Sequence, residues 1–513
     1  MARVRSVDTQ PELSFRRAVW RLGFRFRIHD PRLPGRPDLV FPRQRLAVFI
    51  DGDFWHGHQW RTRRLAQVDE QFQTATNAAY WRAKIRRNIE RDFRTTHEIL
   101  GRGWSVLRLW ATDVAKNLEG CVSMTVAALE NRKTSSSSAV LASRQVGEFF
   151  AGIGLVRLAF ESRGWPVVYA NDFDEQKAAM YRANFGATDL STEDIHSVAS
   201  NGLPECAIYT ASFPCNDLSI AGAMKGLNGT RSGAFWGFVR ILRELGEKAP
   251  PLVLLENVVG FLMSHDGRDF ETAMTALNEV GYCCDAFILN ASSFTPQSRP
   301  RLFIVAKRTR LNDPSGIVPP CAVRPPVLSN YITCHPNIEW DIRRLPAPPC
   351  CSQTLADIVE ELPASDPAWW NEDRAAYFFG QLSERHTAAA ERMIAGPRYT
   401  YATAFRRVRN GRSMAELRTD GIAGCLRTPR GGSGRQILFK AGRGKFSVRL
   451  MTARECARLQ GTPDSYKITA PLNQALFGFG DAVCVPAIEW IIDNYLNPAL
   501  TEMLRGRVLK HQA

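Results

Sequence analysis

The stretch Gln145-Val-Gly-Glu-Phe-Phe-Ala-Gly-Ile-Gly154 predicts the fold of the larger part of this 513-residue chain. An apolar, strand-like run leads into two glycines, and Leu155–Arg163 continues with the spacing of a helix. Glycines in a tight turn between strand and helix let a ligand approach the backbone, and the first turn of the helix offers free N–H donors. The stretch therefore favours an α/β domain that binds a ligand at the carboxyl end of this strand.

Strand-like and helix-like segments alternate after this turn. The expected strands are 145–150, 167–170, 207–211 and 252–255, and the expected helices are 155–163, 175–185 and 235–245. This alternation predicts a mostly parallel sheet with helices on both faces. Asn171-Asp172 ends the second strand, where a carboxylate can hold a ribose diol. An adenosine-containing cofactor is therefore predicted, while its identity stays open at this point.

Two changes in composition divide the chain. The Ser-rich segment 134–144 has the composition of a flexible linker. From residue 311 to 424 the periodicity fades and prolines gather, which predicts a smaller, irregular insertion. We therefore expect a first domain over 1–133, an α/β domain over 145–310 and 425–513, and an inserted domain over 311–424.

Three polar segments fall at predicted strand ends of the α/β domain. Ser212-Phe-Pro-Cys215-Asn216 follows the third strand, Glu256 follows the fourth, and Gln297-Ser-Arg299-Pro-Arg301 precedes another. A thiolate is a nucleophile, a carboxyl group in apolar surroundings can act as an acid, and the alternating arginines could face one cleft. Each segment has a plainer interpretation, since a lone cysteine is more often a small buried hydrophobic residue and the other two occur in solvated loops.

Taken in order, these segments resemble the cytosine-5 DNA methyltransferase family over residues 145 to about 496. The resemblance rests on six motifs: Phe149-Phe-Ala-Gly-Ile-Gly154, Phe213-Pro-Cys215, Glu256-Asn-Val258, Gln297-x-Arg-x-Arg301, Arg454-Glu-Cys-Ala-Arg-Leu-Gln-Gly461 and Gly478-Phe-Gly480. It implies a Rossmann-like S-adenosylmethionine-dependent methyltransferase domain with a target-recognition insertion, a double-stranded DNA partner and a cytosine flipped out of the duplex.

The same resemblance assigns roles to individual residues. Cys215 would add to C6 of the flipped cytosine, Glu256 would protonate or hydrogen-bond N3, and Arg299 and Arg301 would assist Glu256. The residues assigned to the cofactor are Phe150, Gly152, Gly154, Asp172, Asp194, Ile195, Pro214 and Asp481.

Among these, Phe150 would pack on the cofactor, Asp172 would bind the ribose, and Asp194 with Ile195 would flank the adenine. Two positions depart from the family pattern. Asn216 stands where the family usually has Gln, and Asp481 stands where it usually has Asn. Asp481 thus adds a carboxylate near the expected cofactor site.

The first domain is strongly basic. Residues 1–133 hold 25 Lys and Arg against 14 Asp and Glu, which is +11 of the chain's net charge of +15. This density favours a polyanionic partner. Asp38 begins one apolar strand and Asp51 ends the next, so adjacent strands would bring both carboxylates together around Mg²⁺, with His56 as a general base or phosphate contact. The alternative is that both segments are ordinary surface loops.

The resemblance of this domain to the very short patch repair endonucleases, which nick DNA beside a T·G mismatch, rests on Arg5-Ser-x-Asp-Thr9, Glu12, Gly35-Arg-Pro-Asp38 and Phe54-Trp-His56. The resemblance covers residues 1 to about 112 and implies a PD-(D/E)xK-like nuclease domain. It assigns Asp38 and Asp51 to Mg²⁺, His56 and Glu12 to catalytic support, and Phe54-Trp55 to wedging beside the mismatch. Asp51 replaces the family's usual His.

The repair enzymes carry a structural zinc on three Cys and one His. The matching positions here are Asp53, His58, Trp60 and Thr112, and no cysteine precedes Cys121. We therefore expect no zinc in this domain.

The pairing of the two domains has a chemical logic, because deaminated 5-methylcytosine is thymine and leaves a T·G mismatch. A fused nickase would correct the lesions that the methyltransferase creates. Two alternatives stay open: a fused restriction–modification enzyme that cuts unmethylated sites, and an inactive first domain that only binds DNA.

The composition also bears on the compartment. The 12 cysteines include no Cys-x-x-Cys, and no apolar leader or membrane-spanning stretch is visible. We expect a bacterial cytoplasmic protein associated with the nucleoid, with no membrane partner, that acts as a monomer.

Overall fold

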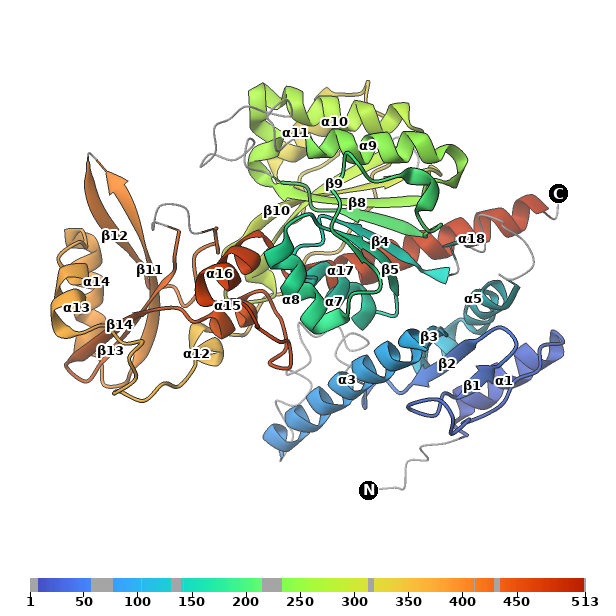
Figure 1. Cartoon of the computed structure of the whole chain (residues 1–513), viewed down its shortest axis with the longest axis horizontal. Coiled ribbons are helices and arrows are strands. Elements are labelled where there is room, and N and C mark those ends of the chain that lie inside the picture. The colour runs from blue at the N-terminus through green and yellow to red at the C-terminus, as the bar shows by residue number, and fades with distance from the viewer. Residues whose placement is uncertain are drawn as a thin grey trace.

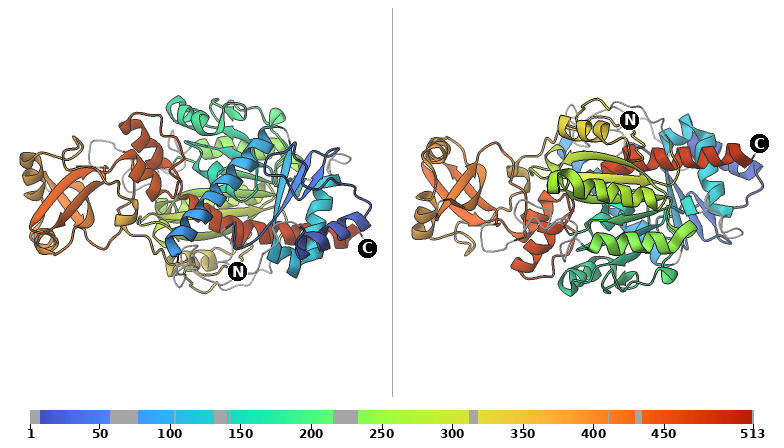
Figure 2. Two further views of the ribbon diagram at one scale, coloured as in Figure 1. Left: turned by 90° about the horizontal axis from the view of Figure 1, so that it is seen from below. Right: turned by 90° about the horizontal axis from the view of Figure 1, so that it is seen from above.

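The computed structural model describes residues 8–56, 77–102, 104–130, 140–141, 143–214, 233–311, 318–409, 411–428 and 434–511. A central α/β unit lies between a small N-terminal unit and an elongated lobe that extends to the opposite side (Figures 1 and 2).

The central unit is built on a seven-stranded sheet with the order β6-β5-β4-β7-β8-β10-β9. Its parallel strands are β4 (Val146–Phe149), β5 (Val167–Asn171), β6 (Leu190–Ser191), β7 (Ile208–Ala211) and β8 (Leu252–Val258). β10 (Pro300–Lys307) runs antiparallel to both β8 and β9 (Cys283–Asn290). β8 is apolar and buried along most of its length because helices cover both faces of the sheet.

Helices join these strands and cover the sheet. They are α7 (Leu155–Ser162), α8 (Glu175–Phe185), α9 (Ala234–Leu245) and α10 (Arg268–Glu279). Short helical turns lie at Ser200–Gly202, Gly246–Lys248, Val259–Gly267 and Ala291–Ser293. Two separate apolar clusters fill the space on the two faces of the sheet. The predicted α/β fold, with a parallel sheet covered on both faces, is confirmed.

The C-terminal helices complete the central unit. They are α15 (Ala453–Leu459), α16 (Leu472–Asp481), α17 (Val485–Ile491), a π-helical turn (Ile492–Leu496) and α18 (Asn497–His511). The stretch Leu472–Leu504 is long and apolar enough to cross a bilayer, but 72% of its most apolar window is buried inside the protein. Its apolar character is therefore that of a core element, packed against α7.

The elongated lobe contains a four-stranded antiparallel sheet with the order β12-β11-β13-β14. The strands are β11 (Thr400–Arg409), β12 (Arg412–Arg418), β13 (Ile437–Gly442) and β14 (Lys445–Leu450), and α13 (Glu372–Phe379) and α14 (Glu384–Ala395) cover one face. α12 (Leu355–Ile358) lies where the lobe joins the central unit.

The boundaries of this elongated lobe differ from the expected insertion at 311–424. Its sheet continues past residue 424 to Leu450, because β13 pairs with β11. At the other end, α11 (Pro326–Cys334) packs into the core of the central unit through Leu328 and Ile332. The regular sheet also differs from the irregular structure that the fading periodicity predicts.

The N-terminal unit is a small three-stranded sheet with helices around it. β2 (Leu46–Asp51) pairs antiparallel with β1 (Leu39–Phe41) and parallel with β3 (Ser105–Trp110). Its helices are α1 (Gln10–Arg21), α3 (Ala78–Gly101), α4 (Ala111–Lys116) and α5 (Leu118–Glu130). The β2–α3–β3 crossover gives the mixed α/β arrangement that the nuclease resemblance implies.

The N-terminal and central units touch each other. α3 packs along α7 (Figure 1). The predicted flexible linker covers 134–144, of which 134–139 and 142 lie outside the described residues, whereas Leu141 is fully buried in the core of the central unit. Arg144 donates to Met124 Sδ of α5 at 3.3 Å and stacks 5.7 Å from the ring centre of Trp165. The linker therefore ends in a packed junction.

Candidate active sites

The turn after β4 has the conformation of a ligand-binding loop. Phe150, Gly152 and Gly154 all have positive φ, at 58°, 58° and 82°. A Cβ on Gly154 would lie 2.4 Å from the Phe185 ring, so only glycine fits there, whereas Gly152 has open space. A phenylalanine at positive φ is a strained residue of the kind that gathers at functional sites.

Asp172 lies at the end of β5, beside this turn. Its carboxylate accepts hydrogen bonds from the Gly152 N–H at 2.7 Å and the Asp174 N–H at 2.9 Å. Burial raises the pKa of Asp172, and the charge of Lys177 and these N–H donors oppose the rise. The neighbouring Phe173, which was not predicted from the sequence, is 63% exposed. A fixed carboxylate beside an exposed ring suits an adenosine group.

Asp194 and Ile195 lie after β6, at the next position along the sheet edge. Asp194 is exposed and accepts a hydrogen bond from the His196 N–H at 2.8 Å, which fixes a local turn. Ile195 is only 5% exposed and packs under the edge against Gly237. The two side chains thus offer one polar and one apolar contact at this edge.

Asp481, the aspartate at a position where the family usually has asparagine, forms an ion pair. Its carboxylate lies at the end of α16 and pairs with Lys177 Nζ of α8 at 2.7 Å. Lys177 also interacts electrostatically with Asp172. The carboxylate that replaces the usual asparagine is therefore neutralised by a lysine next to the predicted ribose site.

The expected nucleophile Cys215, with Asn216, lies outside the described residues. The segment leading to it is described. Phe213 is 3% exposed and its carbonyl accepts from Asn257 Nδ2 of β8 at 3.2 Å, with Pro214 next in the chain. Asn257 therefore anchors the segment that enters the cysteine loop beside the end of β8.

Glu256 and Arg301 form a buried pair at this edge. Antiparallel pairing of β8 with β10 sets Phe303 opposite Glu256, which brings Arg301 Nε within 3.0 Å of Glu256 Oε1. Burial raises the pKa of Glu256, although Arg301 and Arg299 and a hydrogen bond from Ser212 oppose the rise. A carboxyl group with a raised pKa, fixed by a cation, suits an acid that must protonate or donate.

Arg299 has a different position from Arg301. It is 2% exposed and donates to three carbonyls, Leu426 at 2.7 Å, Gly480 at 2.9 Å and Ala482 at 2.6 Å. These carbonyls belong to the segment between β12 and β13 and to the end of α16. Arg299 therefore joins three segments around the site, while Arg301 alone contacts Glu256.

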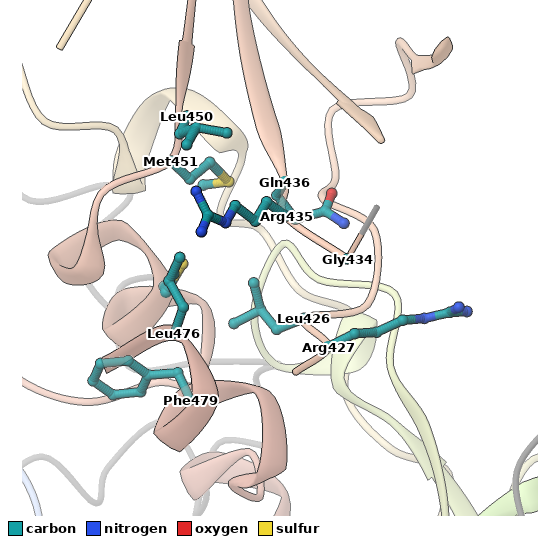
Figure 3. A pocket seen from close by; sticks show the side chains of 10 residues that line it. Leu426, Arg427, Gly434, Arg435, Gln436, Leu450, Met451, Leu476 and Phe479 are labelled. Atoms are coloured by element: carbon teal, nitrogen blue, oxygen red, sulfur yellow. The ribbon is translucent and has the colours of Figure 1, made fainter. Parts of the chain in front are cut away.

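A small cavity of about 10 Å³ lies where the elongated lobe meets α16. Figure 3 shows Leu476 and Phe479 of α16 on one side and Leu450 and Met451 on the other, with Arg427 pointing away. The cavity holds no more than about one water molecule, so this junction is a packed contact.

In the N-terminal unit, Asp38 immediately precedes β1, and Asp51 is the last residue of the neighbouring β2. Asp38 accepts the Ile50 N–H at 2.7 Å. Burial raises the pKa of Asp38 to about 6, the Ile50 bond opposes the rise, and the negative charges of Glu12 and Asp51 add to it. Three carboxylates within electrostatic reach of one another are a typical setting for a divalent cation.

Asp51, however, is already paired. Arg108 of β3 grips both of its oxygens, at 2.6 and 2.7 Å. Of the two predicted metal ligands, only Asp51 is thus bound through both oxygens by an arginine among the described residues, and Asp38 is not. Arg108 was not predicted from the sequence, because it lies 57 residues away on the parallel strand.

His56 follows β2 and contacts two carboxylates. Its Nδ1 lies 3.5 Å from Asp51 Oδ1 and forms a short hydrogen bond with Asp92 of α3. Burial alone would lower the pKa of His56, but Asp92 and Asp51 outweigh burial and raise the pKa. Asp92 thus orients the predicted general base. Its signal in the sequence, one acidic residue on a charged helix, is too common to single out.

Glu12 is held within a polar cluster at the start of α1. Its carboxylate accepts from Thr9 Oγ1 at 2.8 Å, the Asp8 N–H at 2.9 Å and Arg16 at 3.0 Å. Asp8, Glu12 and His29 lie close enough to hold a metal ion, but the Arg16 guanidinium contacts all three. Arg16 therefore supplies the positive charge at this position.

Asp53 and Thr112, two of the four residues at the positions matched to zinc ligands, are hydrogen-bonded to each other. Asp53 accepts from Thr112 Oγ1 at 2.5 Å and from the Thr112 N–H at 3.1 Å, which joins the end of β2 to the start of α4. His58 and Trp60 lie outside the described residues.

Aromatic rings cluster beside this site. Phe54 and Trp55 lie 5.0 Å apart between ring centres, and Trp81 of α3 lies 5.5 and 5.8 Å from them. Lys84 Nζ lies 5.1 Å from the Trp55 ring centre. The structure thus adds a third ring and a cation to the predicted Phe54-Trp55 wedge.

Fold and sites together define a Rossmann-like methyltransferase joined to a nuclease-like unit. Residues 144–497 match the C-5 cytosine-specific DNA methylase family, and residues 1–62 match the DNA mismatch endonuclease Vsr family. The chain therefore belongs to the C-5 cytosine-specific DNA methylase family, with a Vsr domain at its N-terminus.

Individual relatives agree with this division. The Type II methyltransferase M.HhaI of Haemophilus parahaemolyticus is 30% identical over 354 residues, which are 68% of this chain and 92% of that protein. The Type II nicking enzyme V.NmeDIP of Neisseria meningitidis serogroup C is 42% identical over 117 residues, 23% of this chain and 74% of that protein. Among solved structures, the S. pombe Dnmt2 methyltransferase covers 69% of this chain and 98% of its own, with 18% identity and a TM-score of 0.47.

Proposed function

We propose that the central unit transfers a methyl group from S-adenosylmethionine to C5 of cytosine within a specific duplex DNA sequence. The observation that carries this proposal is the buried Glu256–Arg301 pair, which lies beside the anchored segment leading to Cys215. An acid and a nucleophile are the two groups that activation of cytosine requires.

The residues at the neighbouring strand ends fit the cofactor. The Phe150–Gly154 turn leaves open space at Gly152, Asp172 presents a fixed carboxylate, and Asp194 with Ile195 lies at the next edge position. These residues, with Pro214 and the paired Asp481, would hold the nucleoside and the amino-acid end. When bound, S-adenosylmethionine supplies an electrophilic methyl group.

The protein's own groups then act on the base. The Cys215 thiolate adds to C6 of a cytosine flipped from the duplex. Glu256, whose pKa is raised by burial, donates to N3 and stabilises the charge that develops on the ring. Arg301 holds Glu256 in place. After C5 has been methylated, loss of the C5 proton and elimination of the thiolate release the product.

Transfer of labelled methyl groups from S-adenosylmethionine to duplex DNA tests this proposal. Wild-type protein should label DNA, and Cys215→Ser should not. Glu256→Gln should reduce the rate by about 10²-fold or more, the usual contribution of a general acid. Absence of labelling by folded wild-type protein would overturn the proposal.

We further propose that the N-terminal unit is a Mg²⁺-dependent nuclease that nicks DNA at T·G mismatches. The observation that carries it is the cluster of Asp38, Asp51 and His56 at adjoining strand ends, with Asp92 of α3 beside His56. Asp38 would anchor Mg²⁺. Asp51 would become a second ligand only if Mg²⁺ replaced the two hydrogen bonds that Asp51 accepts from Arg108. His56 is oriented by Asp92 to take a proton from water.

Three duplexes separate this proposal from its alternatives. Nicking of T·G DNA alone, in the presence of Mg²⁺, supports repair. Cutting of unmethylated DNA supports a restriction enzyme, and binding without cleavage supports an inactive module. Asp38→Ala should abolish nicking while methyl transfer continues. We expect the protein to act as a monomer on bacterial nucleoid DNA, which its mass in solution and its location in cells would check.

A further inference from the structure

A pocket of about 180 Å³ lies on the elongated lobe, and none of the residues assigned above to catalysis or to the cofactor lines it. Six residues line it: Trp370, Arg374, Arg406, Arg435, Ile437 and Leu450. Trp370 precedes α13 and Arg374 lies on it, while Arg406 comes from β11. The lining therefore combines an apolar wall with three guanidinium groups.

The positive charge in this pocket is not neutralised. Arg374 lies 4.3 Å and Arg406 5.5 Å from the centre of the Trp370 ring. Burial lowers the pKa of Arg406, and the charge of Arg374 lowers it further. Within the described part of the chain, neither arginine forms an ion pair with a carboxylate. Like charges held together without an acid indicate a binding site for an acceptor-rich ligand.

Some donors in the pocket also lack acceptors. The Nε atoms of Arg406 and Arg435 are buried without a hydrogen-bond partner among the described residues. Arg435 donates to Asn473 of α16 at 2.6 Å through another nitrogen. Buried donors without acceptors cost free energy, which a ligand offering acceptors would recover.

The pocket adjoins the contact between the lobe and α16 of the central unit. Arg435 lines both this pocket and the small cavity of Figure 3, where Leu426 lies on the opposite wall. The Leu426 carbonyl is held by Arg299, which also binds the end of α16. A ligand in the pocket would therefore sit on the side of the lobe that adjoins the catalytic unit.

We propose that this pocket reads a guanine of the DNA target, with Arg406 as the reading residue and Trp370 and Arg374 as its support. The inference rests on the proposed methylation of duplex DNA. Guanine presents two adjacent acceptors, O6 and N7, which match the two parallel donors of a guanidinium group. Adenine and cytosine present amino donors at the corresponding edge, so a pocket lined with donors disfavours them. A phosphate offers acceptors as well, and the experiment separates the two sources.

The test is base-resolution sequencing of methylated cytosines in DNA from cells expressing each variant. Arg406→Lys keeps the charge but loses the two parallel donors. If Arg406 reads guanine, Arg406→Lys and Arg406→Ala should both relax one guanine position of the methylated sequence, by roughly 5- to 150-fold in preference. Arg407→Gln is the matched control, because Arg407 is the next residue of β11, half exposed and 3.7 Å from Glu416. It should leave the sequence unchanged.

Two outcomes overturn the inference. Uniformly weaker methylation with an unchanged sequence, restored by Arg406→Lys, identifies a phosphate contact. An unchanged sequence at unchanged efficiency shows that the pocket has no part in recognition. Arg374→Ala provides a second variant should Arg406→Ala fold poorly. Wild-type methylation in the same cells checks the proposed function separately, so its failure is distinguishable from failure of guanine reading.

Discussion

Lys177 Nζ lies 2.7 Å from Asp481 Oδ2, so an ion pair joins the first turn of α8 to the end of α16. The lysine is 22% and the aspartate 48% exposed, which places the pair at the rim of the predicted cofactor site. The same lysine interacts with Asp172, the predicted ribose ligand. Asp481 and Asp172, the predicted ribose ligand, therefore share the positive charge of Lys177.

Asp481→Asn should weaken binding of S-adenosylmethionine even though it restores the residue usual in the family. The released Lys177 would be drawn to Asp172 and would compete with the ribose hydroxyls. The effect should reach up to about fivefold, the scale of a partly exposed ion pair. Isothermal titration calorimetry measures it. Adding Lys177→Ala to Asp481→Asn should restore binding, and equal or tighter binding by the single variant would contradict the argument.

Arg299 and Arg301 should separate in their effects on stability and activity. Arg299→Ala removes three hydrogen bonds from a buried cation to carbonyls and should lower the free energy of unfolding by about 3 kcal/mol or more. Arg301→Ala should reduce methyl transfer with a smaller loss of stability, because Arg301 serves Glu256. Urea denaturation of both variants measures the loss of stability, and their methyl-transfer rates measure the loss of activity. Equal destabilisation by both would refute the distinction.

Asp38→Asn should stabilise the protein at alkaline pH while abolishing nicking. The pKa of Asp38 is about 6 in the folded state against 3.8 for the free side chain, so folding favours its protonated form. Stability from this group is present below pH 4 and is lost as the pH rises to about 6. Above pH 6 the variant should gain about 1–3 kcal/mol over wild type. Thermal unfolding in EDTA at pH 4 and pH 8 tests this, and a gain that does not grow with pH would contradict it.

Much of the catalytic unit was predictable because its signals are local. The glycine turn at 152–154 and the polar residues that follow apolar strands indicate a sheet edge without any knowledge of pairing. The sheet of the elongated lobe could not be predicted in this way. β13 is an apolar segment, and without knowledge of its pairing with β11 its sequence indicates a return to the core of the central unit. The partners of Asp51 and His56 were missed for the same reason. Arg108 and Asp92 reach them only through the β2–β3 pairing and the packing of α3, and neither residue type is distinctive by itself.

The N-terminal unit should fold without zinc. The hydrogen bonds between Asp53 and Thr112 join the end of β2 to the start of α4, at two of the four positions that the resemblance matches to zinc ligands of the repair enzymes. Phenanthroline should leave the melting temperature unchanged, and the purified protein should contain no stoichiometric zinc. Asp53→Ala should cost about 1–2 kcal/mol, similar to loss of a helix cap. A melting temperature that falls on chelation would contradict this prediction.

Asp92→Asn should impair nicking through His56 while leaving DNA binding intact. Asp92 orients the His56 ring and, together with Asp51, raises the pKa of His56 against the effect of burial. Loss of its charge should lower that pKa, so the acidic limb of the pH–rate profile should move to lower pH. The maximal rate should fall by up to about 10²-fold because the base is less well oriented. Glu98→Gln on the same helix is the matched control, since Glu98 is exposed and pairs with Arg102. A variant with the wild-type profile and rate would show that Asp92 does not act through His56.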